Sequence, residues 1–221
     1  MTVMAASPSS YPVDIDIQPQ LAGRNRLTVA FRFILAIPHI LIVGGPIALG
    51  LGLGSRGGFS SWENFGSTGV LGLAANVCAL IAWFAILFTS THPRGLWDFC
   101  HLYLRWRVRA MAYIALFRDE YPPFGDAEYP STVAVSYPES ARNKHSVGLR
   151  IIFAIPHLFI LAFLQLAWSF TTVVAWFAIL FSGAYPEGLY KFGVNVMRWT
   201  IRVDAYMLLM RDEYPPFSLE A

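Results

Sequence analysis

The sequence predicts an all-α integral membrane protein made of two tandem repeats. Hydrophobic residues make up 56% of the 221 residues and charged residues only 14%, whereas about a quarter of the residues in a soluble domain are charged. The heptapeptide RDEYPPF occurs at 118–124 and again at 211–217. It ends a gapless match between 82–124 and 175–217, in which 24 of 43 positions are identical. Each half of the chain should therefore form the same unit.

Composition also limits the possible functions. The net charge of +2 is too small to indicate nucleic acid as the main partner. Cys78 and Cys100 lack the spacing of a zinc site or a disulfide framework. Residues 1–17 lack the basic start and apolar core of a secretory signal. We expect residues 1–10 to form a flexible N-terminus. Residues 218–221 are expected to form a short tail.

The first repeat is expected to span 11–124. Apolar and polar residues alternate over 13–17, which is typical of a short exposed strand. Two apolar stretches, 30–51 and 69–90, are each long enough to cross a bilayer, which takes about 20 residues. They should form a transmembrane hairpin. Between them, the Gly- and Ser-rich insertion 52–69 is expected to be a loop.

The second repeat, 125–217, should follow the same plan. A shorter alternation at 133–135 predicts its strand. Transmembrane helices are expected at 148–166 and 167–183, so the turn between them must fall at Gln165 to Ser169. The alternative is that these two segments are short and re-entrant.

Each repeat then continues into a helix with too many charges to cross a membrane. These helices are expected at 95–117 and 188–210, and each combines a basic stripe with a broad aromatic face. Such a helix lies in the membrane interface, or alternatively packs its aromatic face against the hairpins of its own chain. The stripes comprise Asp98, Arg105 and Arg109 in the first helix and Lys191, Arg198 and Arg202 in the second.

RDEYPPF should end each of these helices, because consecutive prolines cannot continue one. The adjacent Asp119 and Glu120 suggest a paired carboxylate acid–base site. Adjacent charges at a helix end more often form a cap or a local ion pair, and no nucleophile or metal ligand accompanies these. We therefore expect no catalytic residue and no enzyme.

His39 and His157 are the candidate ligands. Each follows a proline inside a predicted membrane helix, and an ionisable group at that depth suggests function. Two histidines from facing helices could hold a haem, a copper ion or a proton path. The alternative is structural: each imidazole bonds a carbonyl that the proline leaves free, or a neighbouring helix. The structural interpretation is favoured, so neither a metal site nor a cofactor is expected.

Several motifs occur in both halves. In the first half they are an arginine followed by I-P-H (Arg32, Pro38, His39), W-F-A-x-L-F (83–88), P-x-G-L (93–96), R-W-x-x-R-x-x-A-Y (from Arg105) and Y-P-P-F (121–124). In these motifs the chain resembles a bacterial family of uncharacterised membrane proteins, catalogued as a domain of unknown function. The resemblance implies a multi-pass bacterial membrane protein and carries no activity. One departure between the copies is Arg107, where the second has Thr200.

The arginine pairs are the candidate binding site. Two arginines one helical turn apart can each donate two parallel hydrogen bonds to a phosphate group. A neighbouring tryptophan fixes the helix at the depth of the lipid headgroups. We expect them to bind anionic lipid headgroups or an acidic partner. The six residues are Arg105, Trp106, Arg109, Arg198, Trp199 and Arg202.

Charge distribution predicts the topology. All Lys and Arg residues except Arg56 lie on the side that would hold both termini, which the positive-inside rule makes cytoplasmic. The expected location is the bacterial plasma membrane. The expected function is a non-enzymatic accessory or scaffold module that contacts lipid, a larger membrane complex or a second copy of itself. The alternative is a small-molecule or lipid transporter, since internal duplication is common among transporters.

Overall fold

The computed structural model describes residues 11–44, 69–125 and 127–219. This part of the chain is mostly helical with one pair of short strands, which confirms the predicted helices and strands at that level. The N-terminal residues 1–10 and nearly all of the predicted loop 52–69 lie outside the described residues.

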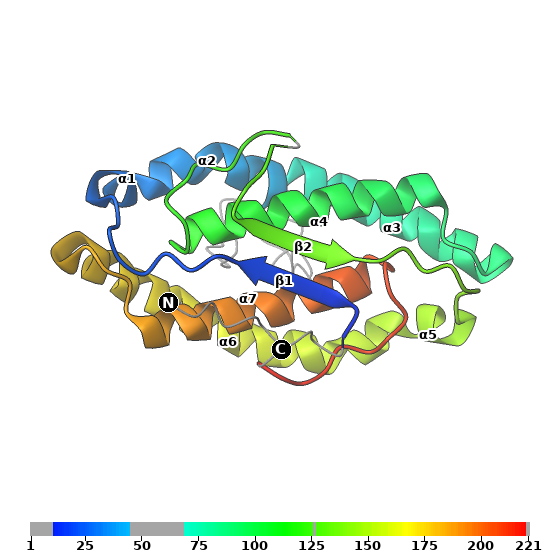
Figure 1. The fold of residues 1–221 in the computed structure, drawn as a ribbon. Helices are drawn as coiled ribbons and strands as arrows, with labels where there is room; N and C mark the ends of the chain where they lie inside the picture. The colour runs from blue at the N-terminus through cyan, green and yellow to red at the C-terminus, as the bar shows by residue number, and fades with distance from the viewer. Residues whose placement is uncertain (1–10, 45–68, 126, 220–221) are drawn as a thin grey trace, which may run out of the picture.

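The two strands pair with each other across the centre of the molecule. β1 (Val13–Ile17) and β2 (Ser131–Val135) are antiparallel, and Ile15 lies opposite Val133 (Figure 1). These two residues occupy equivalent positions in the two halves, so the strand pair has an approximate two-fold axis between them. In both strands the inward residues are buried and the outward ones exposed, as their alternation predicts.

In the first half, two helices lie one after the other along a third. These are α2 (Arg32–Val43), preceded by the short α1 (Arg26–Ala30), then α3 (Val70–Thr89), both packed on α4 (Arg94–Ile114). Near the middle of α4, Arg107 donates from Nη1 to the carbonyl of Val43 at the end of α2, 3.1 Å away. Less than two turns earlier in α4, Cys100 lies against the carbonyl of Ala75 in α3. The predicted hairpin of 30–51 and 69–90 was therefore wrong, because α3 continues where α2 ends.

The junction between α2 and α3 requires a glycine. A Cβ on Gly69 would overlap the carbonyl of Ile42 and the amide nitrogen of Gly44. No other residue type fits so close to a neighbouring backbone. The start of α3 is therefore seated directly on the end of α2.

In the second half, the same path is one uninterrupted helix. After α5 (Lys144–Gly148), the helix α6 runs from Arg150 to Ser182. The predicted helices 148–166 and 167–183, with a turn at Gln165 to Ser169, were wrong. Ser169 donates its hydroxyl to the carbonyl of Gln165 one turn earlier, so its polarity is satisfied within the helix. No glycine interrupts α6, and its one proline, Pro156, is accommodated within it.

The two halves match around this difference. Aligned on the repeat, Gly44 and Gly69 both correspond to Ala162 of α6. In sequence, the first half thus corresponds to the helix of the second half with the 25 residues 45–69 inserted at one point.

The helices α4 and α7 (Glu187–Met207) form the centre of the molecule. The strand pair lies over both, and the long helices pack on them from outside (Figure 1). Gly193 of α7 makes this packing close, because a Cβ there would lie 2.6 Å from Nε1 of Trp168 in α6. The predicted aromatic faces of both helices are buried or half-buried. This favours the prediction that they pack against the rest of the chain over the prediction that they lie in the membrane interface.

Several bonds between the two halves come in equivalent pairs. The indole of Trp83 in α3 donates to the carbonyl of Val147 in α5 (3.0 Å), and Trp176 in α6 donates to Val29 in α1 (2.9 Å). Two backbone bonds repeat the pattern: Arg24 N to the carbonyl of Gly183, and Arg142 N to that of Ser90. Each half thus supplies donors that the other half accepts.

The outer faces of the long helices are apolar and exposed. In α6 the buried residues fall within an arc of about 80° at 100° per residue, and the rest of the circumference is exposed or half-buried. The only charged residues of α2, α3 and α6 are Arg32 and Arg150, both buried. Within the described residues, α3 and α6 are long and apolar enough to cross a membrane.

Candidate functional site

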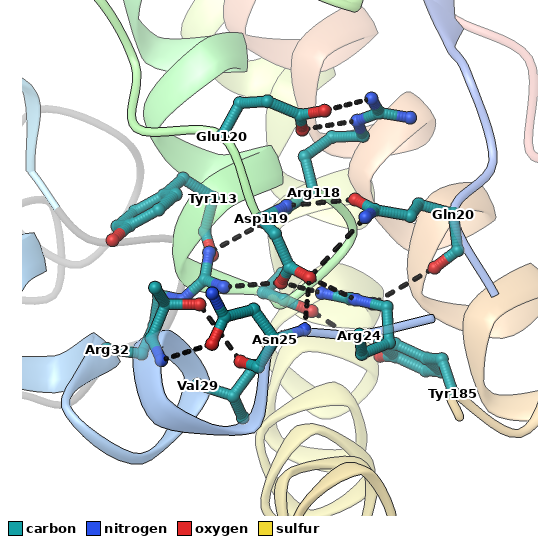
Figure 2. A network of polar contacts seen from close by, with 12 residues as sticks. Gln20, Arg24, Asn25, Val29, Arg32, Tyr113, Arg118, Asp119, Glu120 and Tyr185 are labelled. Atoms are coloured by element: carbon teal, nitrogen blue, oxygen red, sulfur yellow. Dashed lines mark hydrogen bonds and ion pairs between the residues drawn. The ribbon is translucent and has the colours of Figure 1, made fainter. Parts of the chain in front are cut away.

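The first RDEYPPF heptapeptide brings two buried arginines onto one carboxylate (Figure 2). Asp119 accepts from Arg24 Nη2 and Arg32 Nη2, each at 2.7 Å, and Arg24 Nε adds a bond of 3.0 Å. The backbone N–H of Asn25 donates to the same carboxylate at 2.9 Å. Because both arginine side chains are completely buried, Asp119 compensates two charges removed from water.

The face of the Arg32 guanidinium also packs on an aromatic ring. Its Cζ lies 4.0 Å from the ring centre of Tyr113, a cation–π contact. Its Nη1 donates to the carbonyls of Tyr113 and Arg118, where α4 ends. The arginine therefore fastens the start of α2 to the end of α4.

The second half repeats this cluster. Asp212 accepts from Arg142 Nη2 at 2.7 Å and from Arg150 Nη2 at 2.8 Å, and the N–H of Asn143 donates to it. Arg150 again lies over a tyrosine ring, that of Tyr206, at 4.2 Å. We call these two sets of residues the aspartate clusters.

The aspartate clusters shift the acidity of their carboxyl groups. Burial alone would raise the pKa of Asp119, but the bonds from Arg24 and the Asn25 amide, with the charge of Arg32, outweigh it and hold the pKa below its usual value. The pKa of Asp212 is lowered in the same way by Arg142 and Arg150 against the effect of burial. Both carboxylates therefore stay ionised at neutral pH.

The remaining charges of RDEYPPF pair within the motif. Arg118 binds Glu120 through two bonds of 2.6 and 2.9 Å, and Arg211 binds Glu213 at 2.7 and 3.1 Å. Both glutamates and both aspartates of the motif are thus engaged by arginines. This arrangement fastens the chain after α4 and α7.

The two histidines are each enclosed by their own half. His39 stacks on Phe124 at 4.7 Å between ring centres and lies 4.8 Å from Tyr121. In the second half, His157 stacks on the ring of Phe217 at 4.0 Å and accepts a bond of 3.1 Å from Trp199 Nε1. The Y-P-P-F residues thus cover each imidazole. No group of three metal-binding side chains occurs among residues 11–44, 69–125 and 127–219.

The predicted arginine pairs face the strand pair and its connections. Arg198 is half-buried and its Nε lies 3.4 Å from the carbonyl of Ile15 in β1, while Arg109 is buried and donates to the carbonyl of Gly125. Arg202 is also buried, and Arg105 is half-buried. The two tryptophans differ in burial. Trp106 is half-buried and contacts Phe124, whereas Trp199 is buried and contacts His157.

Arg107, the residue that breaks the repeat, joins the two central helices. Its Nε donates to Asp204 of α7 at 2.9 Å. The equivalents of the two residues are Thr200 and Met111, which are uncharged, so the ion pair is made once. Burial raises the pKa of Asp204, although Arg107 opposes that rise.

The comparisons with known proteins match two segments of the chain to one family. A family model described as a domain of unknown function, DUF4389, matches residues 67–125 and 144–218, together more than half of the chain. The chain belongs to the DUF4389 family. Neither the curated proteins nor the solved structures contain a match. The two DUF4389 segments include both aspartates of the clusters and the long second-half helix α6.

Sequence reasoning missed two arginines of the aspartate clusters. Arg24 and Arg142 lie outside the segments matched to DUF4389 and outside the predicted helices. A signal was present, because each stands eight residues before the arginine of the I-P-H motif in its own half. Two arginines repeated at one spacing require a carboxylate if both are buried, and RDEYPPF is the repeated motif that offers one.

Proposed function

We propose that this protein is a non-enzymatic membrane module, a scaffold held in the membrane by the outer faces of α2, α3 and α6. The observation that carries the proposal is the apolar surface of these helices. Large side chains such as Phe88, Phe159 and Phe181 are 67–80% exposed, and the charged residues within these three helices, Arg32 and Arg150, are buried. An apolar surface of this extent marks a site that contacts membrane or protein.

Two further observations support a scaffold. The carboxylates of RDEYPPF are bound to arginines, which leaves them to hold helices together. Each histidine is covered by aromatic rings of its own half, which supports a structural role for both. These contacts favour a structural role for the motifs that the sequence singles out.

The test is membrane retention. Cells expressing the protein are fractionated, and the membranes are washed with alkaline carbonate, which removes peripheral proteins. The wild type should stay in the membrane pellet. A variant with Phe159, Phe163, Phe170 and Phe177 all changed to Ser should be released in large part, because each phenylalanine is about half exposed or more. Thr132→Ser with Ala134→Ser, on the outward face of β2, is the matched control. Release of the wild type by carbonate would contradict the proposal.

Binding of anionic headgroups or an acidic partner by the arginine pairs remains part of the proposal. Arg105 and Arg198 now carry it, since they keep partial exposure while Arg109 and Arg202 are buried. Arg105→Gln with Arg198→Gln should lower the anionic lipid or acidic protein that copurifies in mild detergent. Recovery equal to the wild type would leave these arginines with only a structural role.

A further inference from the structure

We infer that the molecule lies flat in one leaflet, with α6 and the α2–α3 line parallel to the membrane plane and the strand pair toward water. This inference rests on the proposed membrane attachment and specifies its geometry. It replaces the expectation of four transmembrane spans and two cytoplasmic termini. Three independent features of the described structure lead to it.

The first feature is the length of the apolar face. Exposed apolar residues run along α6 from Ile151 to Phe181, a distance of about 45 Å at 1.5 Å per residue. The hydrocarbon core of a bilayer is only about 30 Å thick. An upright α6 would hold exposed isoleucine or phenylalanine in the headgroup layer or in water at one end or both. Even a tilt at the upper end of the usual range, about 40°, does not remove the mismatch.

The second feature is the position of the strand pair relative to α6. Arg198 bonds the carbonyl of Ile15 in β1, and two residues further along α7, Thr200 bonds Gln165, the sixteenth of the 33 residues of α6. The strand pair therefore lies level with the middle of α6. If α6 stood upright across a bilayer, the strands would lie at the bilayer midplane.

Strands at the midplane would place exposed carboxylates and unpaired backbone groups among the lipid tails. Asp14 and Asp16 point outward from β1 and are exposed. A two-stranded ribbon also has two open edges, and unpaired backbone groups are not tolerated against lipid tails. Exposed carboxylates at that depth are equally unfavourable. The upright orientation is therefore excluded by the same contacts that hold the strands on α7.

The third feature is the separation of charge from the apolar face. Exposed charged residues lie in β1, in the segments beside the strands and at the ends of the helices, for example Asp16, Glu139 and Lys144. None lies on the outer faces of α2, α3 or α6. For the part of the chain that the structure describes, an uncharged apolar surface on the outer helices and charges elsewhere fit the membrane surface, where apolar faces sink about 5–10 Å among the lipids. The apolar side thus contacts the acyl chains of one leaflet.

Depth measurements on spin labels test this orientation. Single cysteines replace Phe159, Leu166 and Phe177, which share one face of α6, and Thr132 on the strand pair, in a background with Cys78→Ala and Cys100→Ala. Each protein is reconstituted into phosphatidylcholine vesicles containing phosphatidylglycerol. Collisions of each label with oxygen, which concentrates in lipid, and with a water-soluble nickel chelate report its depth.

The flat orientation predicts one shared depth for the three α6 labels, with high oxygen accessibility, and high nickel accessibility for the Thr132 label. A gradient in which the Leu166 label is deepest and the other two approach opposite headgroup layers would overturn it, while leaving membrane attachment intact. If all the labels are open to nickel, the proposed function itself fails. The middle position is repeated with Phe170→Cys, so that one disturbed variant does not decide the result.

Discussion

At the scale of single residues, the two aspartates of RDEYPPF each compensate two buried arginines. Arginine keeps its charge when it is buried, so Arg24 and Arg32 depend on Asp119 for compensation. The same holds for Arg142 and Arg150 with Asp212. The heptapeptide is repeated because each half contains such a pair of arginines.

Asp119→Asn should therefore destabilise the protein strongly. It leaves two completely buried guanidinium groups facing a neutral amide, and breaking a buried pair costs on the order of 3 kcal/mol. Asp98→Asn is the control, since its bond to Arg94 is exposed and should contribute less than about 1 kcal/mol. Thermal unfolding in detergent measures both. Equal unfolding midpoints for the two variants would contradict the assigned role of Asp119.

The aspartate clusters also predict a dependence on pH. The pKa values of Asp119 and Asp212 are lower in the folded protein than in the unfolded chain, so the unfolded chain binds more protons in acid. Their contribution to stability is present above about pH 4 and is lost as the pH falls through the lowered values. Unfolding midpoints measured between neutral and acidic pH should fall steeply at the acidic end. In the double variant Asp119→Asn with Asp212→Asn, the fall of the unfolding midpoint at acidic pH should be smaller than in the wild type. An unchanged fall would show that other groups cause the pH dependence.

At the scale of elements, the decisive feature is that α6 is a single helix. Its buried residues recur from Arg150 to Ile179 at spacings of three and four, all on one side. This regular stripe lets α7 pack along it without a turn. The stripe in α3 is built from Gly72, Ala75, Ala79 and Ala82, whose small size brings α4 close.

A distance measurement tests the continuity of α6. Spin labels at Phe159 and Phe177, in a background without Cys78 and Cys100, should be about 27 Å apart, since 18 residues rise 1.5 Å each. In a hairpin turning at Gln165 to Ser169 the same positions would lie side by side, about 10 Å apart. Pulsed electron paramagnetic resonance separates these values directly, and the shorter one would restore the hairpin.

The sequence could predict the helices but not how they are joined. Apolar length and helix-breaking residues located α3, α4 and α7 to within a few residues. They do not reveal whether two successive apolar stretches turn back or continue, because both arrangements satisfy the same hydropathy pattern. The helical periodicity of the stripe through Gln165 and Trp168 was the available evidence for continuity. The direction of the arginine pairs could not be predicted, because it depends on the strand pair that lies over α4 and α7.

At the scale of the whole molecule, the two halves are joined by symmetric bonds and one asymmetric ion pair. The pair of Arg107 and Asp204 has no counterpart at Met111 and Thr200. Both side chains are nearly buried, so the pair fixes α4 against α7 at a considerable desolvation cost.

Removing one partner of this pair should be worse than removing both. Asp204→Asn leaves the Arg107 charge buried without its carboxylate and should cost about 3–5 kcal/mol. Arg107→Met with Asp204→Met replaces the pair by apolar side chains and should recover most of that loss. Chemical unfolding of the three proteins measures the difference. A double variant as unstable as the single one would mean that the ion pair itself holds the helices together.

The position of Ile15 opposite Val133 has a consequence for chains of half this length. Across the two-fold axis between these residues, the strand pairing and the tryptophan bonds each take a donor from one half and an acceptor from the other. A chain with a single unit would have the same donors and acceptors but no second half to meet them. It would satisfy them by forming a homodimer with a self-complementary interface, in which the strand residue on the axis faces its own copy.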